Sequence, residues 1–127
     1  MKRKLIFLPL LMIILIVAAS LIAGTILSAP HREQIGDVPT YLKGENIALS
    51  SASGATLRGW FLPGKQGAGA VVLMHGVRAS RTAMLGHATF LSRAGYSILL
   101  FDFQAHGEST GDHITFGQLE SKMRRQP

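Results

Sequence analysis

Two short turns in this chain carry the residues best suited to chemistry. Met74-His75-Gly76-Val77 ends the apolar run Ala70–Met74, and Ala105-His106-Gly107-Glu108 follows the apolar run Ser97–Phe103. One stretch of helical length separates them. Buried parallel strands bring their carboxyl ends to the same edge of an α/β sheet, which is where such sheets bind ligands. Both turns are therefore predicted to face one crevice.

The first turn can supply backbone N–H groups to that crevice. Gly76 has no side chain, so a ligand can approach the backbone closely there, and N–H groups at such a turn can stabilise an oxyanion. The alternative is a plain turn between strand and helix, in which His75 bonds neighbouring backbone. Spacing alone leaves both interpretations open.

Ser109 matches a nucleophile pattern only in its letters. Residues 107–111 read G-x-S-x-G, but a nucleophile elbow needs a strand that runs directly into the first Gly and a helix directly behind the Ser. Residues 104–106 separate the predicted strand from Gly107, and the β-branched residues Ile114-Thr115 are unfavourable for a helix behind the Ser. Asp112-His113 lie too close in sequence to provide two successive hydrogen-bonded partners. Ser109 is therefore not predicted to be the nucleophile.

The remaining patterns predict no metal and no cofactor. Residues 59–65 approach a phosphate-binding loop, but Gln66 replaces the hydroxyl that would hold magnesium. Cysteine is absent, which excludes disulfides, thiol nucleophiles and thiolate metal sites. The histidines lack the close spacing with carboxylates that metal sites use. They are His31, His75, His87, His106 and His113.

The net charge of +6 does not indicate nucleic-acid binding, because the clustered basic residues lie at the two ends of the chain. Residues 1–4 form a basic N-terminus, and Arg124 and Arg125 lie in the C-terminal tail. Between them the charges are mixed and sparse, without the clusters of Lys and Arg that track phosphates. No nucleic-acid partner is predicted.

Residues 5–27 are almost wholly apolar and carry no charge. A helix of this length covers about 34 Å, which is enough to span a bilayer. With the basic cluster before it, it is predicted to be a single-pass membrane anchor, with a cytoplasmic N-terminus and an extracytoplasmic domain. The alternative is a secretory signal cleaved near residues 18–20, which would export the domain as well.

The rest of the chain predicts an α/β fold. Polar residues 28–41, which include two prolines, are expected to link the anchor to the domain. Alternating residues in 45–50 and 56–62 predict an antiparallel hairpin. A strand at 70–74, a helix at 83–94 ended by Gly95 and a strand at 97–103 predict a parallel βαβ unit. A further helix is expected over 115–123.

The run from Ala70 to Gly111, with VVLMHGVRASR followed by GYSILLFDFQAHGEST, resembles the N-terminal half of the α/β-hydrolase fold. The similarity is to the serine-hydrolase branch with serine aminopeptidase-like and dienelactone hydrolase-like members, and it covers most of residues 42–120. It implies that the backbone N–H of Val77 belongs to an oxyanion hole, with His75 and Gly76 shaping the turn.

The second turn, by the same resemblance, is a supporting loop beneath the site. Its residues are Asp102, His106, Gly107 and Ser109, with Gln104-Ala105 where the family commonly has Arg-Gly. The resemblance places the nucleophile, acid and His downstream, so residues 42–127 are expected to be a truncated domain. The expected function is the N-terminal fragment of a membrane-anchored hydrolase of small-molecule esters or peptides, inactive alone. The alternative is a non-catalytic, membrane-anchored remnant.

Overall fold

The segments with alternating apolar residues form an antiparallel hairpin in the computed structural model, which describes residues 2–117. Strand β2 (Glu45–Ser50) pairs with β3 (Thr56–Leu62). The turn between them is closed by a hydrogen bond of 2.8 Å from the Ser51 N–H to the Ala55 carbonyl. The predicted hairpin is confirmed with these bounds.

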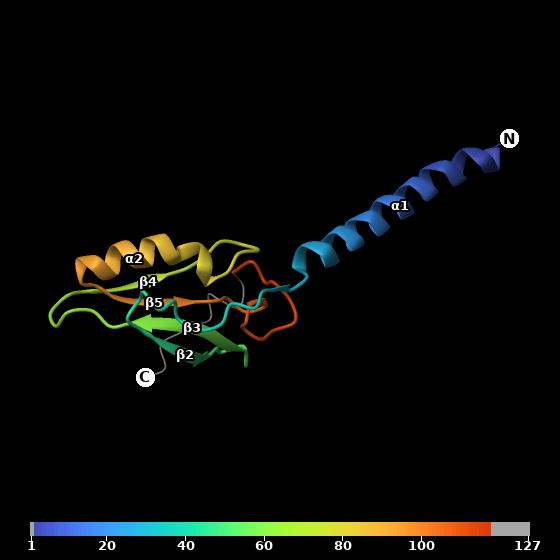
Figure 1. Cartoon of the computed structure of the whole chain (residues 1–127). Coiled ribbons are helices and arrows are strands. Elements are labelled where there is room, and N and C mark those ends of the chain that lie inside the picture. The colour runs from blue at the N-terminus through green and yellow to red at the C-terminus, as the bar shows by residue number, and fades with distance from the viewer. Residues whose placement is uncertain (1, 118–127) are drawn as a thin grey trace.

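A parallel βαβ unit follows the hairpin, as predicted. Strand β4 (Ala70–Leu73) pairs in parallel with β5 (Ser97–Phe101), and the 3-10 helix η1 (Arg81–Met84) and helix α2 (Leu85–Ala94) connect them. Helix α2 ends where Gly95 adopts a left-handed φ of 96° and donates its N–H back to the last turn. Figure 1 shows α2 lying along one side of the strands.

The sheet has the order β2-β3-β5-β4, so β5 lies in its interior between a parallel and an antiparallel neighbour. Gly59 in β3 faces Phe101 in β5 across this junction. A Cβ at position 59 would lie 2.4 Å from the Leu100 carbonyl oxygen, so only glycine allows the two strands to approach this closely.

Strand β4 forms an edge of this sheet, which corrects the expectation that it is covered on both faces. Its burial alternates along the strand, and the Val72 side chain is 51% exposed. Leu73 packs against the buried cluster that includes Ala88 of α2, whereas Val72 faces away from it. Among residues 2–117 no strand pairs with its outer edge. Phe90 on α2 is also exposed.

Two clusters of apolar side chains fill the two sides of the sheet. The larger lies beneath α2, and the smaller lies on the opposite side near the hairpin turn. The larger has as its buried members Leu42, Trp60, Leu62, Ala88, Ile98 and Leu100, and the smaller has Ala55, Leu57 and Phe101.

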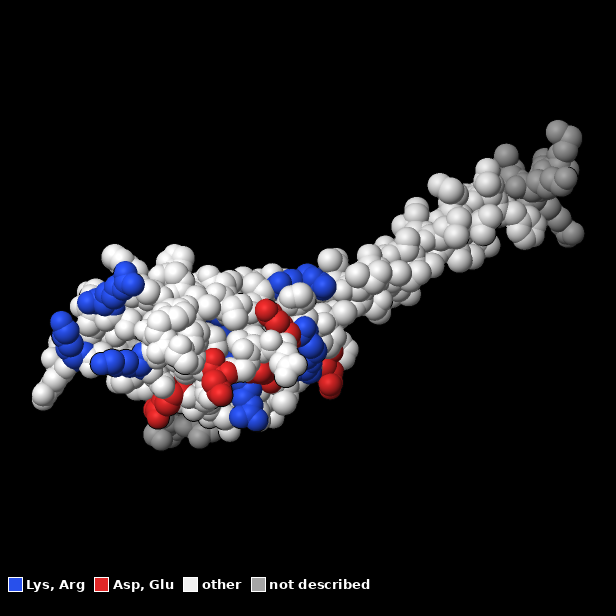
Figure 2. Space-filling view, in the orientation of Figure 1, with Lys and Arg blue, Asp and Glu red and all other residues white. Residues whose placement is uncertain are grey.

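Helix α1 (Lys2–Ser28) extends away from the domain (Figure 1). Its segment Phe7–Ser28 is long and apolar enough to cross a membrane, with a mean hydropathy of 2.8, and none of it is buried against the rest of the described chain. Figure 2 shows no charged side chain along Phe7–Ser28, whereas charges of both signs are scattered over the domain. The helix agrees in extent with the apolar segment 5–27.

The segment 28–41, expected to be a linker, is hydrogen-bonded to the domain in its first part. Strand β1 (His31–Arg32) pairs in parallel with β6 (His106–Gly107), within the second His-Gly turn. The Ser28 carbonyl, at the end of α1, accepts a hydrogen bond of 2.9 Å from the Ile114 N–H. The chain between α1 and the domain is thus held on the loop that follows β5.

The helix expected over 115–123 does not begin within the described residues. Phe116 and Gly117 have φ values of 50° and 94°, which form a turn in place of a first helical turn. Residues 118–123 of that prediction lie outside the described part of the chain.

Candidate functional site

The two His-Gly turns meet at the carboxyl ends of β4 and β5, as their spacing predicts. The rings of His75 and His106 lie with centroids 5.1 Å apart, and the ring of Phe103 packs edge-on against His75 at 5.0 Å. Beside them is a cavity of about 360 Å³. Its lining comes from both turns and from the loop after the second: His75, Gly76, Val77, Phe103, His106, Ile114, Phe116 and Gly117.

Each turn is fastened to the other by a histidine. His75 Nε2 accepts the Phe103 N–H at 3.0 Å, so its proton lies on Nδ1, which donates to the Gly76 carbonyl at 2.8 Å. His106 Nε2 accepts the Arg78 N–H at 3.1 Å, and its Nδ1 donates to the Gln104 carbonyl at 2.9 Å. Both nitrogens of both rings are therefore engaged with backbone.

The environment of His75 favours its neutral form. Burial lowers the pKa of His75 below the ordinary 6.5, and the neighbouring His106 acts in the same direction, while the bond to Gly76 opposes them. A neutral ring is what its hydrogen bonds require, because Nε2 must accept from Phe103. His75 therefore shapes the first turn and has no free nitrogen for proton transfer.

Val77 follows Gly76 in the first turn and lines the cavity, and its side chain is 57% exposed. Within residues 2–117 its N–H has no hydrogen-bond acceptor. The next residue, Arg78, has a left-handed φ of 57°, an uncommon conformation that is held by the hydrogen bond from its N–H to His106. The turn thus presents one unpaired backbone donor beside an open cavity.

Gly76 plays a smaller steric part than the sequence predicts. A Cβ built at this position meets no atom of the described chain within 4 Å. Its contribution here is its carbonyl, which accepts from His75 Nδ1 and from the Ala79 N–H at 3.3 Å.

Ser109 is placed as a structural residue. Its hydroxyl is fully buried, donates to the Asp102 carbonyl at 2.6 Å and accepts the Arg58 N–H at 2.9 Å. No helix follows it within the described chain. Because the hydroxyl is enclosed and occupied, it has no access to a substrate.

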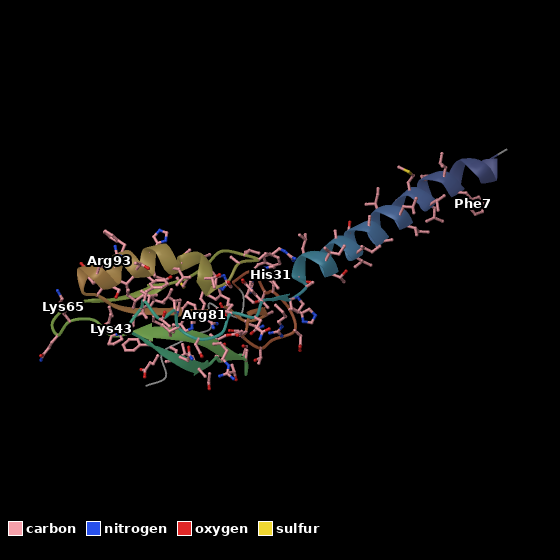
Figure 3. All side chains as sticks on the ribbon, in the orientation of Figure 1. Phe7, His31, Lys43, Lys65, Arg81 and Arg93 are labelled. Atoms are coloured by element: carbon pink, nitrogen blue, oxygen red, sulfur yellow. The ribbon has the colours of Figure 1, made fainter. Side chains whose placement is uncertain are left out.

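A buried ion-pair network supports the second turn. Its central residue, Arg81, is not among the candidate site residues that the sequence predicts. Asp102 pairs with the Arg81 guanidinium and also accepts the Arg81 N–H at 2.7 Å and the Glu108 N–H at 3.1 Å. Arg81 and Asp102 are 2% and 0% exposed. The guanidinium lies 4.6 Å from the centre of the Trp60 ring (Figure 3 shows Arg81 within the domain). The two partners are 21 positions apart, which conceals this pair from the sequence pattern.

Glu108 extends the network to the segment that follows α1. Its carboxylate pairs with Arg81 at 2.5 Å and accepts the N–H groups of Gly36 and Ile35 at 2.9 Å and 3.1 Å. Burial alone would raise the pKa of Glu108, but these donors outweigh it and hold the pKa below the ordinary 4.5.

A solved esterase shares this architecture. The chain superimposes on the esterase Pf2001 of Pyrococcus furiosus in two crystal forms. In one the TM-score is 0.63, with 28% identity over 75% of this chain and 40% of the esterase; in the other the TM-score is 0.62, with 26% identity over 76% and 39%. This chain carries the N-terminal part of an α/β-hydrolase fold.

The sequence comparison agrees in extent. The uncharacterized protein YfhR of Salmonella typhimurium is 28% identical over 87 residues, which are 65% of this chain and 30% of YfhR. No family model matches the chain. The chain therefore spans about a third of the curated relative and about two fifths of the esterase.

Proposed function

We propose that this chain is the oxyanion side of a serine hydrolase of the esterase type, held at a membrane by α1. The observation that carries the proposal is the unpaired Val77 N–H beside the cavity, on a turn held by His106 and followed by the strained Arg78. When a nucleophile attacks an ester carbonyl, the carbonyl oxygen becomes negative, and a fixed N–H donor stabilises that charge.

The nucleophile and its acid and base are proposed to come from residues other than those described. Ser109 is enclosed, and His75 and His106 have no free ring nitrogen. The similarity to an esterase of which this chain covers 40% supports the assignment to the ester-hydrolysing class. The sequence predicts esters or peptides as substrates, and hydrolysis of peptides is included in this proposal as the alternative to hydrolysis of esters.

Membrane anchoring through residues 5–27, with the N-terminus in the cytoplasm and the domain outside, belongs to the same proposal. It is supported by the apolar span Phe7–Ser28 and by the basic residues Lys2, Arg3 and Lys4 before it. Glycosylation sites introduced into the domain, or protease protection in sealed membrane vesicles, would report which side the domain occupies.

A second candidate is a non-catalytic remnant anchored in the membrane. The observation that favours it is the outer edge of β4, with which no strand of the described chain pairs, together with the exposed Val72 side chain on that strand. Such an edge promotes association with other strands. Treatment of the purified chain with a fluorophosphonate probe does not distinguish the two candidates, because both predict no labelling.

Translation of the coding region beyond Pro127 in all three frames separates them. The hydrolase proposal expects a strand followed by Gly-x-Ser-x-Gly and later an Asp and a His, and absence of that series favours the remnant. In the extended protein, Val77→Pro removes the N–H and is expected to lower kcat about 100- to 1000-fold, whereas Val77→Ala keeps the N–H and most of the activity. Equal activity of the two variants would refute the role of Val77.

A further inference from the structure

The candidate crevice lies at the end of the domain that faces α1. The carboxyl ends of β4 and β5 and the loop after them, orange to red in Figure 1, lie next to the domain end of that helix. Ile114 in this loop lines the cavity, and its N–H donates at 2.9 Å to the carbonyl of Ser28, the last residue of α1. One wall of the cavity is thus one hydrogen bond from the end of the apolar span.

The same segment is fixed in place by further contacts. Arg32, four residues after α1, donates to the carbonyls of Ser109 and Gly111, the latter at 2.7 Å, and β1 pairs with β6. In Figure 3, His31 lies at the junction with α1, whereas Lys65 lies at the opposite end of the domain. These contacts hold the crevice toward the end of α1 and away from the far end of the domain.

The lining at this end is apolar. Val77, Phe103, Ile114 and Phe116 supply most of it, and the side chains of Val77 and Phe116 at its rim are 57% and 59% exposed. A volume of about 360 Å³ lies within the range of sites for small organic ligands. Exposed apolar side chains at the rim of an apolar cavity mark a surface that contacts an apolar partner.

We propose that this crevice takes the acyl chain of a lipid ester directly from the bilayer that α1 spans, an inference that rests on the proposed hydrolase function. The span Phe7–Ser28 covers about 33 Å and places Ser28 at the edge of the hydrocarbon layer. An acyl chain that moves from the bilayer into an apolar cavity loses little apolar contact on the way. A substrate dissolved in water gains nothing from a crevice beside the membrane.

The orientation is tested with single-cysteine variants of the full chain, which contains no natural cysteine. Phe116→Cys places a bimane label at the rim, and the exposed Lys65→Cys places a matched label at the far end. Both are reconstituted in phosphatidylcholine nanodiscs with and without lipid that carries a doxyl quencher. Quenching at position 116 and none at position 65 is expected. Equal quenching at both positions, or none at either, overturns the proposal.

The substrate class is tested by binding to the label at position 116. Dodecyl glycerol ether, which cannot be hydrolysed, is expected to shift the bimane emission, and propyl glycerol ether is not. Val77→Asp keeps the backbone N–H but places a charge in the apolar rim, and it should weaken binding of the dodecyl ether about tenfold. Equal responses to both ethers, or no effect of Val77→Asp, overturn the proposal.

These measurements need no catalysis, so they fail independently of the proposed function. Quenching at position 116 without a downstream Gly-x-Ser-x-Gly supports a lipid-binding crevice and contradicts the proposed hydrolase function. A downstream triad without quenching leaves a hydrolase whose substrate arrives from water.

Discussion

Replacing Asp102 with Asn tests whether the buried ion pair with Arg81 holds the second His-Gly turn. The carboxylate accepts three hydrogen bonds, from the guanidinium and N–H of Arg81 and from the N–H of Glu108. An amide keeps one oxygen acceptor, but its NH₂ group faces donors in place of the other oxygen. At least one charged hydrogen bond is lost, and Arg81 keeps its charge while 2% exposed.

The magnitude follows from these contacts. Each hydrogen bond to a charged group contributes about 1.5–3 kcal/mol, and removing one partner of a buried ion pair costs about 3–5 kcal/mol. Asp102→Asn is therefore expected to lower the free energy of unfolding by about 3–5 kcal/mol. Glu108, which also contacts Arg81, keeps the loss at the lower end of that range.

The assay is urea unfolding of the full chain in detergent micelles, followed by tryptophan fluorescence. Trp60 is the only tryptophan and lies 4.6 Å from the Arg81 guanidinium, so it reports on this region directly. At a urea dependence of about 2 kcal/mol per molar, a loss of about 3 kcal/mol lowers the midpoint by about 1.5 M.

The double variant Arg81→Met with Asp102→Asn is the control for a chain that simply fails to fold. It leaves neither partner charged, so it should recover a large part of the stability lost in Asp102→Asn. A loss below about 1 kcal/mol in the single variant, or losses that merely add in the double variant, would refute the reasoning.

Three further predictions concern the same domain. Gly59→Ala places a Cβ 2.4 Å from the Leu100 carbonyl oxygen and should destabilise the chain by about 1–3 kcal/mol in the urea assay. Its control is Gly86→Ala, in open space on α2, which should leave stability unchanged or raise it by up to about 1 kcal/mol. Folding lowers the pKa of His75, so the unfolded chain binds a proton there more readily than the folded chain. The free energy of unfolding should therefore fall as the pH drops below about 6.5. Comparison of the urea midpoints at pH 7.5 and 5.5 measures this loss of stability. Ser109→Ala should cost about 1–3 kcal/mol through its two lost hydrogen bonds and leave fluorophosphonate labelling unaltered.

Each of the three has an outcome that contradicts it. Equal stability of the two alanine variants would show that β3 and β5 move apart freely at position 59. A pH dependence that persists unchanged in His75→Gln would assign it to other groups. Labelling of the natural chain by the fluorophosphonate that disappears in Ser109→Ala would make Ser109 a nucleophile and overturn its structural role.

Elements whose signals are local could be predicted from the sequence. Alternation with a period of two in residues 45–50 and 56–62 gives the bounds of β2 and β3, because neighbouring side chains on a strand face opposite sides. Gly95 marks the end of α2 because a left-handed residue is needed there. The meeting of the two His-Gly turns followed from the parallel arrangement of β4 and β5.

The way these turns are locked together could not be predicted. His75 and His106 accept N–H groups from residues 28 positions away along the chain, and a sequence pattern does not show which backbone donors lie within reach. For the same reason the sequence left two interpretations of the first turn open, one in which it stabilises an oxyanion and one in which it is a plain turn with His75 bonded to neighbouring backbone.

Periodicity, capping and motif spacing lie in neighbouring residues, so they were enough to predict strands β2, β3, β4 and β5, helix α2, the apolar N-terminal span and the likeness to α/β-hydrolases. Only the tertiary structure decided that β4 lies at an exposed edge, that Arg81 and Asp102 pair out of water, and that residues 28–36 pack on the second turn. Those features join residues 21 to 79 positions apart, and they exist only once the sheet order has brought distant segments into contact.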